Sequence, residues 1–187
     1  MGKREDIIEA TKALLWENGY EATSPRDIQE KSHAGQGSFY HHFPSKQALA
    51  LVAIQEVVDE RIADFEKAMA LNVSFRQRLS TYVAQNRRPL LGCRVGRLVW
   101  DSAARDETLR LPLEQYFGHL EARLVSILED DAANGKVTLK MPAHQIALMI
   151  LSVVQGSFTV SRAMKRSRAG DARSALLAFL DIVIVDR

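Results

Sequence analysis

The stretch from Ser24 to Lys46 constrains the fold of this chain more than any other part of the sequence. Ser24 can cap a helix, Pro25 suits the first helical position, and Asp27 lies three residues after the cap, as in a capping box. The segment 32–35, Ser-His-Ala-Gly, then breaks the helical pattern. These signals predict a short helix that ends in a tight turn.

A second short helix is predicted over residues 36–43. Phe39 and Phe43 are four positions apart, so their side chains share one face and point inward. The opposite face carries small and hydrogen-bonding groups, and no acid occurs from Gly35 to Pro44. A helix that enters the DNA major groove must keep carboxylates away from phosphates and present polar groups to base edges. The two helices therefore predict a helix-turn-helix unit that binds DNA.

Side-chain length and position suggest how each candidate residue would contact DNA. Gln36 is long enough to reach a base edge, and Gly37 lets the backbone come close to the duplex. Hydroxyl and cationic groups suit phosphates, and His41 could contact either a base or a phosphate. Lys46 follows Ser45 at the start of the next helix, where both favour a phosphate. The predicted set is Ser24, Arg26, Gln36, Gly37, Ser38, Tyr40, His41 and Lys46.

The run GQGSFYHHFPSKQAL, from Gly35 to Leu49, resembles the signature of the TetR family of bacterial transcriptional regulators. The resemblance is close over the N-terminal quarter of the chain and extends to the remainder only as a pattern of helices. The family usually has glycine at the turn position that His33 occupies here. Histidine tolerates the left-handed conformation better than most residues, so we expect some strain and not a different fold.

Helical periodicity continues through the rest of the chain, with no internal repeat. Pattern and resemblance together predict an all-α protein of about nine helices. The expected organisation is a helix-turn-helix DNA-binding domain over residues 1–47 and a helical ligand-binding and dimerisation domain over residues 48–187. The helices are predicted over residues 3–18, 24–32, 36–43, 45–70, 74–86, 91–103, 106–133, 142–164 and 171–185.

The last two predicted helices, 142–164 and 171–185, are apolar around most of their circumference. Such a helix must be buried on both sides, with one side against its own core and the other against a partner. Homodimerisation through these two helices of each chain is the simplest solution. The family resemblance implies the same arrangement.

The predicted DNA-binding quarter is not basic overall, although the whole chain has 25 basic and 23 acidic residues. Residues 1–50 contain six lysines and arginines against seven acids. Any positive potential near DNA must therefore be local, and we expect it from Arg26, Lys46, the helix N-termini and protonated His41 or His42.

The family resemblance implies a small-molecule effector that binds the C-terminal body and releases a double-stranded DNA operator. Repression is the more frequent behaviour in the family, but activation is possible. Aromatic residues at helical spacing belong to a core more often than to a pocket. The candidate ligand-binding residues are Tyr82, Cys93, Trp100, Tyr116, Phe117, His119, Met149, Gln155 and Phe158.

Cys93 allows an alternative function, because it stands at a predicted helix start with Arg94 and Arg97 nearby. Both features favour a thiolate, and the Gly-Cys pair resembles TetR-like proteins that sense oxidants or electrophiles. The other interpretation is a small buried apolar residue. A further alternative is an architectural DNA-binding protein without a ligand.

Catalysis is not expected, because no close metal-ligand pattern, nucleophile elbow, P-loop or dinucleotide motif occurs. We therefore expect no cofactor and no metal. The single cysteine excludes an internal disulfide and fits a reducing cytoplasm. The apolar run 146–154 is too short to span a bilayer, so no membrane association is expected.

Overall fold

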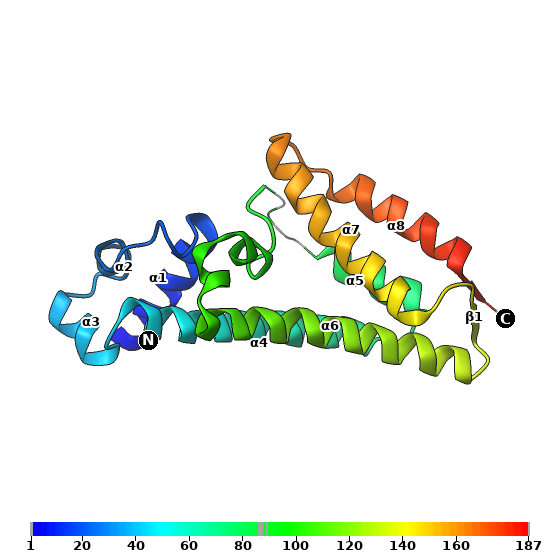
Figure 1. Ribbon diagram of the computed structural model, residues 1–187, viewed down its shortest axis with the longest axis horizontal. Coiled ribbons are helices and arrows are strands. Elements are labelled where there is room, and N and C mark those ends of the chain that lie inside the picture. The colour runs from blue at the N-terminus through cyan, green and yellow to red at the C-terminus, as the bar shows by residue number, and fades with distance from the viewer. Residues whose placement is uncertain (1, 86–87, 89, 187) are drawn as a thin grey trace. The chain divides into compact units, whose positions relative to one another are not determined.

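The computed structural model of the protein describes residues 2–85, 88 and 90–186. Within these residues the chain forms eight α-helices, two short 3-10 helices and two short strands, which confirms the predicted all-α class. The predicted end of one helix at Asn86 lies outside the described residues. In chain order the elements are α1 (Lys3–Glu17), α2 (Pro25–Ser32), α3 (Gln36–His42), α4 (Lys46–Met69), α5 (Phe75–Ala84), η1 (Gly96–Trp100), η2 (Ser102–Arg105), α6 (Glu107–Ala133), β1 (Val137–Leu139), α7 (Ala143–Ala163), α8 (Ala169–Val183) and β2 (Ile184–Asp186) (Figure 1).

The chain divides into two compact units, and each has its own internal packing. The first unit consists of residues 1–61 and 94–116, and the second consists of residues 62–93 and 117–187. Helices α4 and α6 each contribute one part to each unit. The boundary that the sequence suggests at residue 47 remains a prediction about independent domains.

The first unit is built around α1, which contacts both α2 and α3. Ile7 and Ile8 of α1, Ile28 of α2 and Phe39 of α3 are all buried. Burial of an apolar side chain of this size contributes about 1.5–3 kcal/mol, so this small cluster fixes the three helices to one another. Leu49 at the start of α4 is also fully buried and closes the core of the unit.

A buried lysine connects α1 to α4 within the first unit. The Lys12 side chain is only 4% exposed, and its Nζ lies 2.7 Å from Glu9, 2.7 Å from Glu56 and 2.9 Å from Glu60. Burial alone would lower the pKa of Lys12, but its hydrogen bonds to Glu56, Glu60 and Glu9 outweigh that effect and raise it. Arg94 also pairs with Glu60, at 3.2 Å. Lys12 is therefore held in its charged form inside the unit.

The prediction of an α-helix over residues 91–103 is wrong, because this segment forms the two 3-10 helices η1 and η2. The interruption lies at Asp101, whose backbone is extended between them. The Asp101 carboxylate accepts hydrogen bonds from the backbone N–H groups of Tyr20 at 2.9 Å and Glu21 at 3.2 Å. Since these bonds come from the turn after α1, a continuous helix is replaced by a tertiary contact that anchors that turn.

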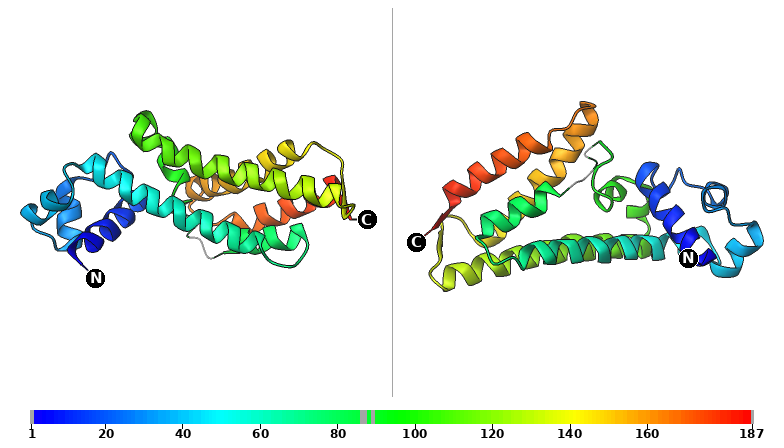
Figure 2. Two further views of the ribbon diagram at one scale, coloured as in Figure 1. Left: turned by 90° about the horizontal axis from the view of Figure 1, so that it is seen from below. Right: turned by 180° about the vertical axis from the view of Figure 1, so that it is seen from behind.

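The second unit packs α7 against α8, and α5 against α8. Helices α7 and α8 run side by side in both views of Figure 2. Strands β1 and β2 pair antiparallel, with Val137 opposite Asp186 and Leu139 opposite Ile184. Asp131 is a buried acid in this unit, and its carboxylate pairs with Arg78 at 3.2 Å and Lys136 at 2.9 Å.

Helix α7 is, among the described residues, the one helix long and apolar enough to cross a membrane by length and composition. It has 21 residues, an 18-residue window of it reaches a mean hydropathy of 1.4, and it contains the apolar run 146–154 within the predicted helix 142–164. One such helix is weak evidence for a membrane span, because helices from protein cores meet the same criteria. Here one side of α7 packs against α8.

Candidate nucleic-acid interface

The first helix of the predicted DNA-binding motif begins with the capping box that the sequence indicates. The Ser24 hydroxyl accepts a hydrogen bond from the backbone N–H of Asp27, and the Asp27 carboxylate accepts one from the backbone N–H of Ser24. Hydrogen bonds from the Ser24 hydroxyl and from its backbone hold the pKa of Asp27 below its ordinary value. The start of α2 is thus fixed by local contacts.

The turn between α2 and α3 contains the left-handed residue that the sequence suggests. His33 has φ 52° and ψ 33° and ends α2. The backbone N–H of Ala34 returns to the carbonyl of Gln29 at 3.1 Å, so the last turn of α2 remains hydrogen-bonded. The Lys3 ammonium also donates to the His33 carbonyl, at 3.2 Å. These contacts compensate for the cost of a left-handed non-glycine residue.

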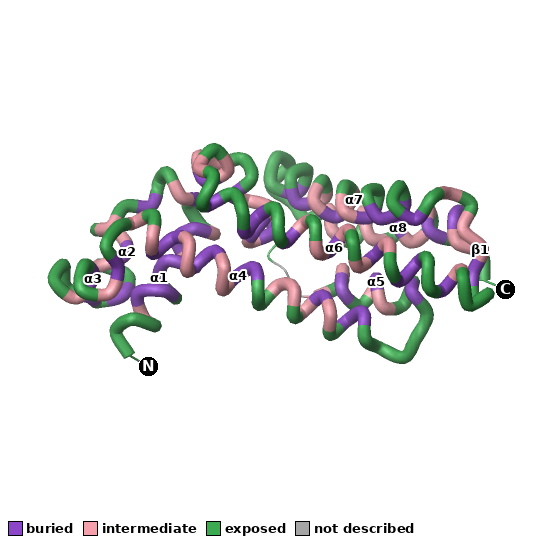
Figure 3. Tube along the Cα trace, turned by 60° about the horizontal axis from the view of Figure 1, so that its bottom comes forward, coloured by how far each residue is buried: buried purple, intermediate pink, exposed green. Residues whose placement is uncertain are grey.

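Helix α3 has one buried face and one exposed face, as predicted. Phe39 and Phe43 are buried, whereas Gln36, Tyr40 and His41 are exposed. Figure 3 shows the same alternation of buried and exposed positions along the helix. Tyr40 keeps 49% of its surface exposed, although its ring contacts Phe39 edge to face at 5.0 Å. The helix therefore presents an outer surface with no acid, and the Tyr40 ring on that surface contacts Phe39.

Gly37 leaves open space on that outer surface. A methyl group built on its backbone would meet no other atom within 4 Å. The protein interior therefore gives no reason for a glycine here, and no positive φ requires one. An external surface that approaches the backbone closely would give such a reason.

Two predicted phosphate contacts are occupied within the protein. Arg26 pairs with Glu30 at 2.9 Å, with both side chains mostly exposed, so this pair contributes little to stability and can exchange partners. The Lys46 ammonium lies 4.2 Å from the centre of the Tyr20 ring. Burial lowers the pKa of Lys46 from its ordinary value, although Asp101, Glu21 and Asp27 oppose this change.

Lys3 and Arg4 at the start of α1 are candidate contacts that the sequence reasoning missed. Neither makes an ion pair with the part of the chain that the structure describes. Lys3 reaches the turn before α3, and the Arg4 guanidinium lies 5.5 Å from the centre of the Phe43 ring. The basic pair in the sequence was the available signal, but only the fold places it beside α3.

The other predicted interface lies on the outer face of α7 and α8. Large apolar side chains are exposed there, including Leu148 at 56% and Ile182 at 72%. The same two helices also expose the small residues Gly156, Ala175 and Ala178. The opposite sides of both helices are buried in their own unit. Both helices therefore expose large apolar side chains, for which the sequence predicted a partner.

The predicted ligand-binding residues are divided between the two units. Tyr82 is buried and packs edge to face on Phe65 at 5.0 Å, while His119 bonds to Glu66 at 2.8 Å. Trp100 is 86% exposed and so lines no enclosed site in this chain. Trp100 and Tyr116 belong to the first unit, whereas Tyr82, Cys93, Phe117, His119, Met149, Gln155 and Phe158 belong to the second.

Two cavities in the second unit can be compared with the predicted ligand-binding residues. One of about 240 Å³ has Phe158 in its wall, at the junction of α5, α7 and α8. The other, of about 630 Å³, lies beside the start of α5 and the two strands, and the sequence did not point to it. Its cations are already paired, with Arg76 bound to Asp181 at 2.9 Å and Arg78 to Asp131 at 3.2 Å.

Cys93 does not stand at the start of an α-helix, which corrects one premise of the sensing hypothesis. It is a buried free cysteine that precedes η1 by three residues. The Arg94 guanidinium is engaged by Glu60 and lies 5.6 Å from the centre of the Trp16 ring. The small buried apolar interpretation therefore accounts for the environment that the structure gives.

Comparison with known proteins gives three consistent findings. Residues 7–53 match the family model described as bacterial regulatory proteins, tetR family. An HTH-type transcriptional regulator of Lactococcus lactis subsp. lactis, encoded in the lacX 3' region, is 30% identical over 166 residues, covering 82% of this chain and 80% of that protein. The repressor KstR of Mycolicibacterium smegmatis is 32% identical over 94 residues, covering 48% of this chain and 46% of that protein.

Among solved structures, the reduced form of NemR from E. coli has a TM-score of 0.85 to this chain. The two share 18% of their residues over 99% of this chain and 98% of that one. At this identity the likeness shows a common fold.

Proposed function

Because this chain belongs to the TetR family of bacterial transcriptional regulators, we propose that it represses transcription by binding a palindromic operator as a homodimer. A small-molecule inducer would release it from that operator. The observation that carries the proposal is the outer face of α3, which is exposed, free of acids, and open at Gly37. The name of KstR supports repression as the direction of control.

The α3 face would enter the major groove, where Gln36 reaches base edges and Gly37 allows close approach of the backbone. Ser38, Tyr40 and His41 would contact the flanking backbone or bases. Lys46 would have to exchange its contact with the Tyr20 ring for a phosphate. Lys3 and Arg4 would add phosphate contacts beside α3.

Dimerisation would occur through the outer face of α7 and α8. A two-fold axis would bring Leu148 and Ile182 of each chain into one four-helix contact and remove their apolar surface from water. Two α3 helices would then occupy successive major grooves, with half-sites about 34–36 Å apart or a larger helical multiple.

Induction would work by a shift in population between dimer states. An inducer that binds more tightly to a state whose α3 helices do not match the groove spacing lowers the fraction of DNA-binding protein. The cavity of about 240 Å³ in the second unit supports this version over a ligand-free architectural protein. We also propose that the protein acts in the cytoplasm, without catalysis.

The test is a gel-shift series with an operator selected from random duplex DNA. Tyr40→Ala and Lys46→Ala should each bind the operator about tenfold or more weakly, because each removes a contact to the DNA backbone. Leu71→Ala, at an exposed loop position in the second unit, is the matched control and should bind as the wild type does. If Tyr40→Ala and Lys46→Ala both bind the operator as tightly as the wild type does, the proposed DNA contact is rejected.

A further inference from the structure

The cavity at the junction of α5, α7 and α8 combines an apolar wall with a cation, Arg173, that pairs with no described residue. Its volume is about 240 Å³, below the ~300–1,000 Å³ of sites for drug-sized ligands, so its ligand must be small. The apolar wall of the cavity is formed by Val83, Val154 and Phe158. The polar residues in its lining are Gln85, Ser157 and Arg173.

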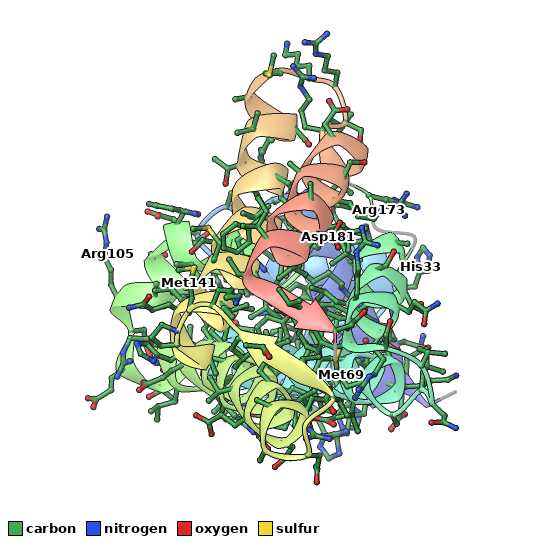
Figure 4. All side chains as sticks on the ribbon, turned by 90° about the vertical axis from the view of Figure 1, so that its right-hand side faces the viewer. His33, Met69, Arg105, Met141, Arg173 and Asp181 are labelled. Atoms are coloured by element: carbon green, nitrogen blue, oxygen red, sulfur yellow. The ribbon has the colours of Figure 1, made fainter. Side chains whose placement is uncertain are left out.

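Arg173 has no hydrogen bond or ion pair with the part of the chain that the structure describes. The acid nearest to it in sequence, Asp171, is occupied by Arg168 at 2.6 Å and is 73% exposed. Asp171 does not line the cavity. Figure 4 shows the Arg173 side chain extending from α8 on the side away from α7. Arg173 is half-buried as a residue and lines the cavity, and its guanidinium has five N–H donors to offer.

The neutral polar groups of the lining are partly occupied. The Ser157 hydroxyl donates its proton to the carbonyl of Val154 at 2.7 Å, so it can only accept from a ligand. The Gln85 amide donates to the carbonyl of Asp64 at 3.5 Å. Arg173 is thus the strongest donor available to a ligand, and a planar guanidinium matches a carboxylate in two parallel hydrogen bonds.

We propose that this cavity binds a small organic acid, with its carboxylate on Arg173 and its apolar body against Val83 and Phe158. The inference rests on the proposed function, because it names the chemical class of the inducer. A neutral molecule of the same shape would leave the guanidinium without an anion. A cation would meet Arg173 as a like charge.

The position of this cavity also suits a role in regulation. A methyl group built on Gly92 would lie 3.9 Å from Phe158 Cβ, so the chain passes directly beside the cavity wall. The backbone of Gly92 has φ 87°, a conformation that residues with a side chain rarely adopt. Two residues later, Arg94 is fixed to Glu60 of α4. Movement of the wall by a ligand would therefore act on a short covalent link that leads to that ion pair.

The experiment is titration calorimetry on the purified full-length protein with four probes. Benzoate and hexanoate are the acids, and benzamide and hexanamide are their neutral counterparts. The acids should bind, and the amides should bind about 10- to 100-fold more weakly, since they lose a hydrogen bond between two charged groups. Arg173→Gln should remove the preference for acid over amide.

Arg162→Gln is the matched control, because Arg162 is exposed on α7 and does not line the cavity; this variant should keep the preference. Gly170→Phe is an independent test, since the backbone of Gly170 borders the cavity and faces open space. It should abolish binding of both acids by filling the site. Circular dichroism would verify that each variant is folded.

Three results would overturn the inference: no binding of either acid, equal binding of acids and amides, or an unchanged preference in Arg173→Gln. Wild-type binding of the acids by Gly170→Phe would overturn it as well. A gel shift with the operator, made without any acid, separates this inference from the proposed function. If neither acid binds but the operator does, only the organic-acid inference is rejected. If the operator does not bind, the proposed function is rejected, whatever the calorimetry shows.

Discussion

The two units of this protein place polar and apolar groups in opposite ways. The first unit exposes small and polar groups on α3 and keeps a charged lysine, Lys12, in its interior. The second unit exposes apolar side chains such as Leu148 and Ile182 on α7 and α8. Exposing an apolar face to water is unfavourable, so such a face indicates a permanent interface. A polar face is stable in water and suits a transient partner.

The largest effect should follow from charging the apolar face of the second unit. The double variant Leu148→Glu and Ile182→Glu would place four carboxylates in the proposed four-helix contact of a dimer, which should dissociate it. Operator affinity should fall about 100-fold or more, because a monomer keeps only half of the phosphate contacts. Sedimentation velocity and gel shift measure the two effects.

Leu71→Glu is the control for that variant, because Leu71 is 41% exposed in the loop before α5 and is not part of α7 or α8. It should remain dimeric with normal operator affinity. A double variant that stays dimeric would show that α7 and α8 do not form the interface.

The next effect should come from the interior charge of the first unit. Lys12→Met leaves Glu9, Glu56 and Glu60 close together without their shared cation, and the free energy of unfolding should fall by about 3 kcal/mol. Denaturant unfolding measures the loss. Lys31→Met removes an exposed pair with Glu17 and should cost less than about 1 kcal/mol.

The pH dependence of the Lys12 contribution has a definite sign. Its pKa is raised in the folded protein, so its stabilisation is complete below the unfolded lysine pKa of about 10.4 and is lost only as the pH rises through the folded value. The difference between wild type and Lys12→Met should therefore be constant between pH 7 and pH 9. A difference that shrinks across this range would contradict the raised pKa.

A smaller effect should separate stability from binding on the polar face of α3. Gly37→Ala adds a methyl group in open space within a helix, so stability should rise by about 0.5–1 kcal/mol. Operator affinity should fall about tenfold, because the methyl group would hold the backbone away from DNA. Gly118→Ala in α6 also points into open space and should raise stability without changing affinity.

The smallest effect concerns the acid that caps α2. The pKa of Asp27 is lowered by its bonds to Ser24, so its stabilisation is present above the unfolded value of about 3.9 and is lost as the pH falls through the folded value. Asp27→Asn should lower the Tm slightly at pH 7, and the difference should narrow below about pH 4. If the Tm difference between wild type and Asp27→Asn instead grows below about pH 4, the Asp27 carboxylate is not the source of the stabilisation.

Local contacts explain which parts of the fold were predictable. The capping box at Ser24, the left-handed turn at His33 and the inward pair Phe39 and Phe43 each depend on residues a few positions apart, and the structure contains all three. The predicted helix over residues 91–103 failed for the opposite reason. Its sequence allows a helix, but Asp101 accepts hydrogen bonds from Tyr20 and Glu21, some eighty positions earlier.

The candidate sites divide along the same line. The α3 face could be predicted because one short helix displays it, whereas the ligand-binding set mixed core residues such as Tyr82 with the exposed Trp100. Arg173 could not have been selected from the sequence, where it is one of 25 basic residues. What distinguishes it is that no acid among the described residues pairs with it beside a cavity, which is a property of three helices together.

The sequence by itself determined the helical class, the limits of the helix-turn-helix and the side of α3 that faces outward, because each depends on spacing along one stretch of chain. Only the tertiary structure decided that Lys12 is buried among three acids, that Asp101 interrupts a helix, and that Arg173 has no ion pair with any described residue. Those outcomes depend on which distant side chains meet, and hydrogen bonding and burial at such meetings outweigh local preference.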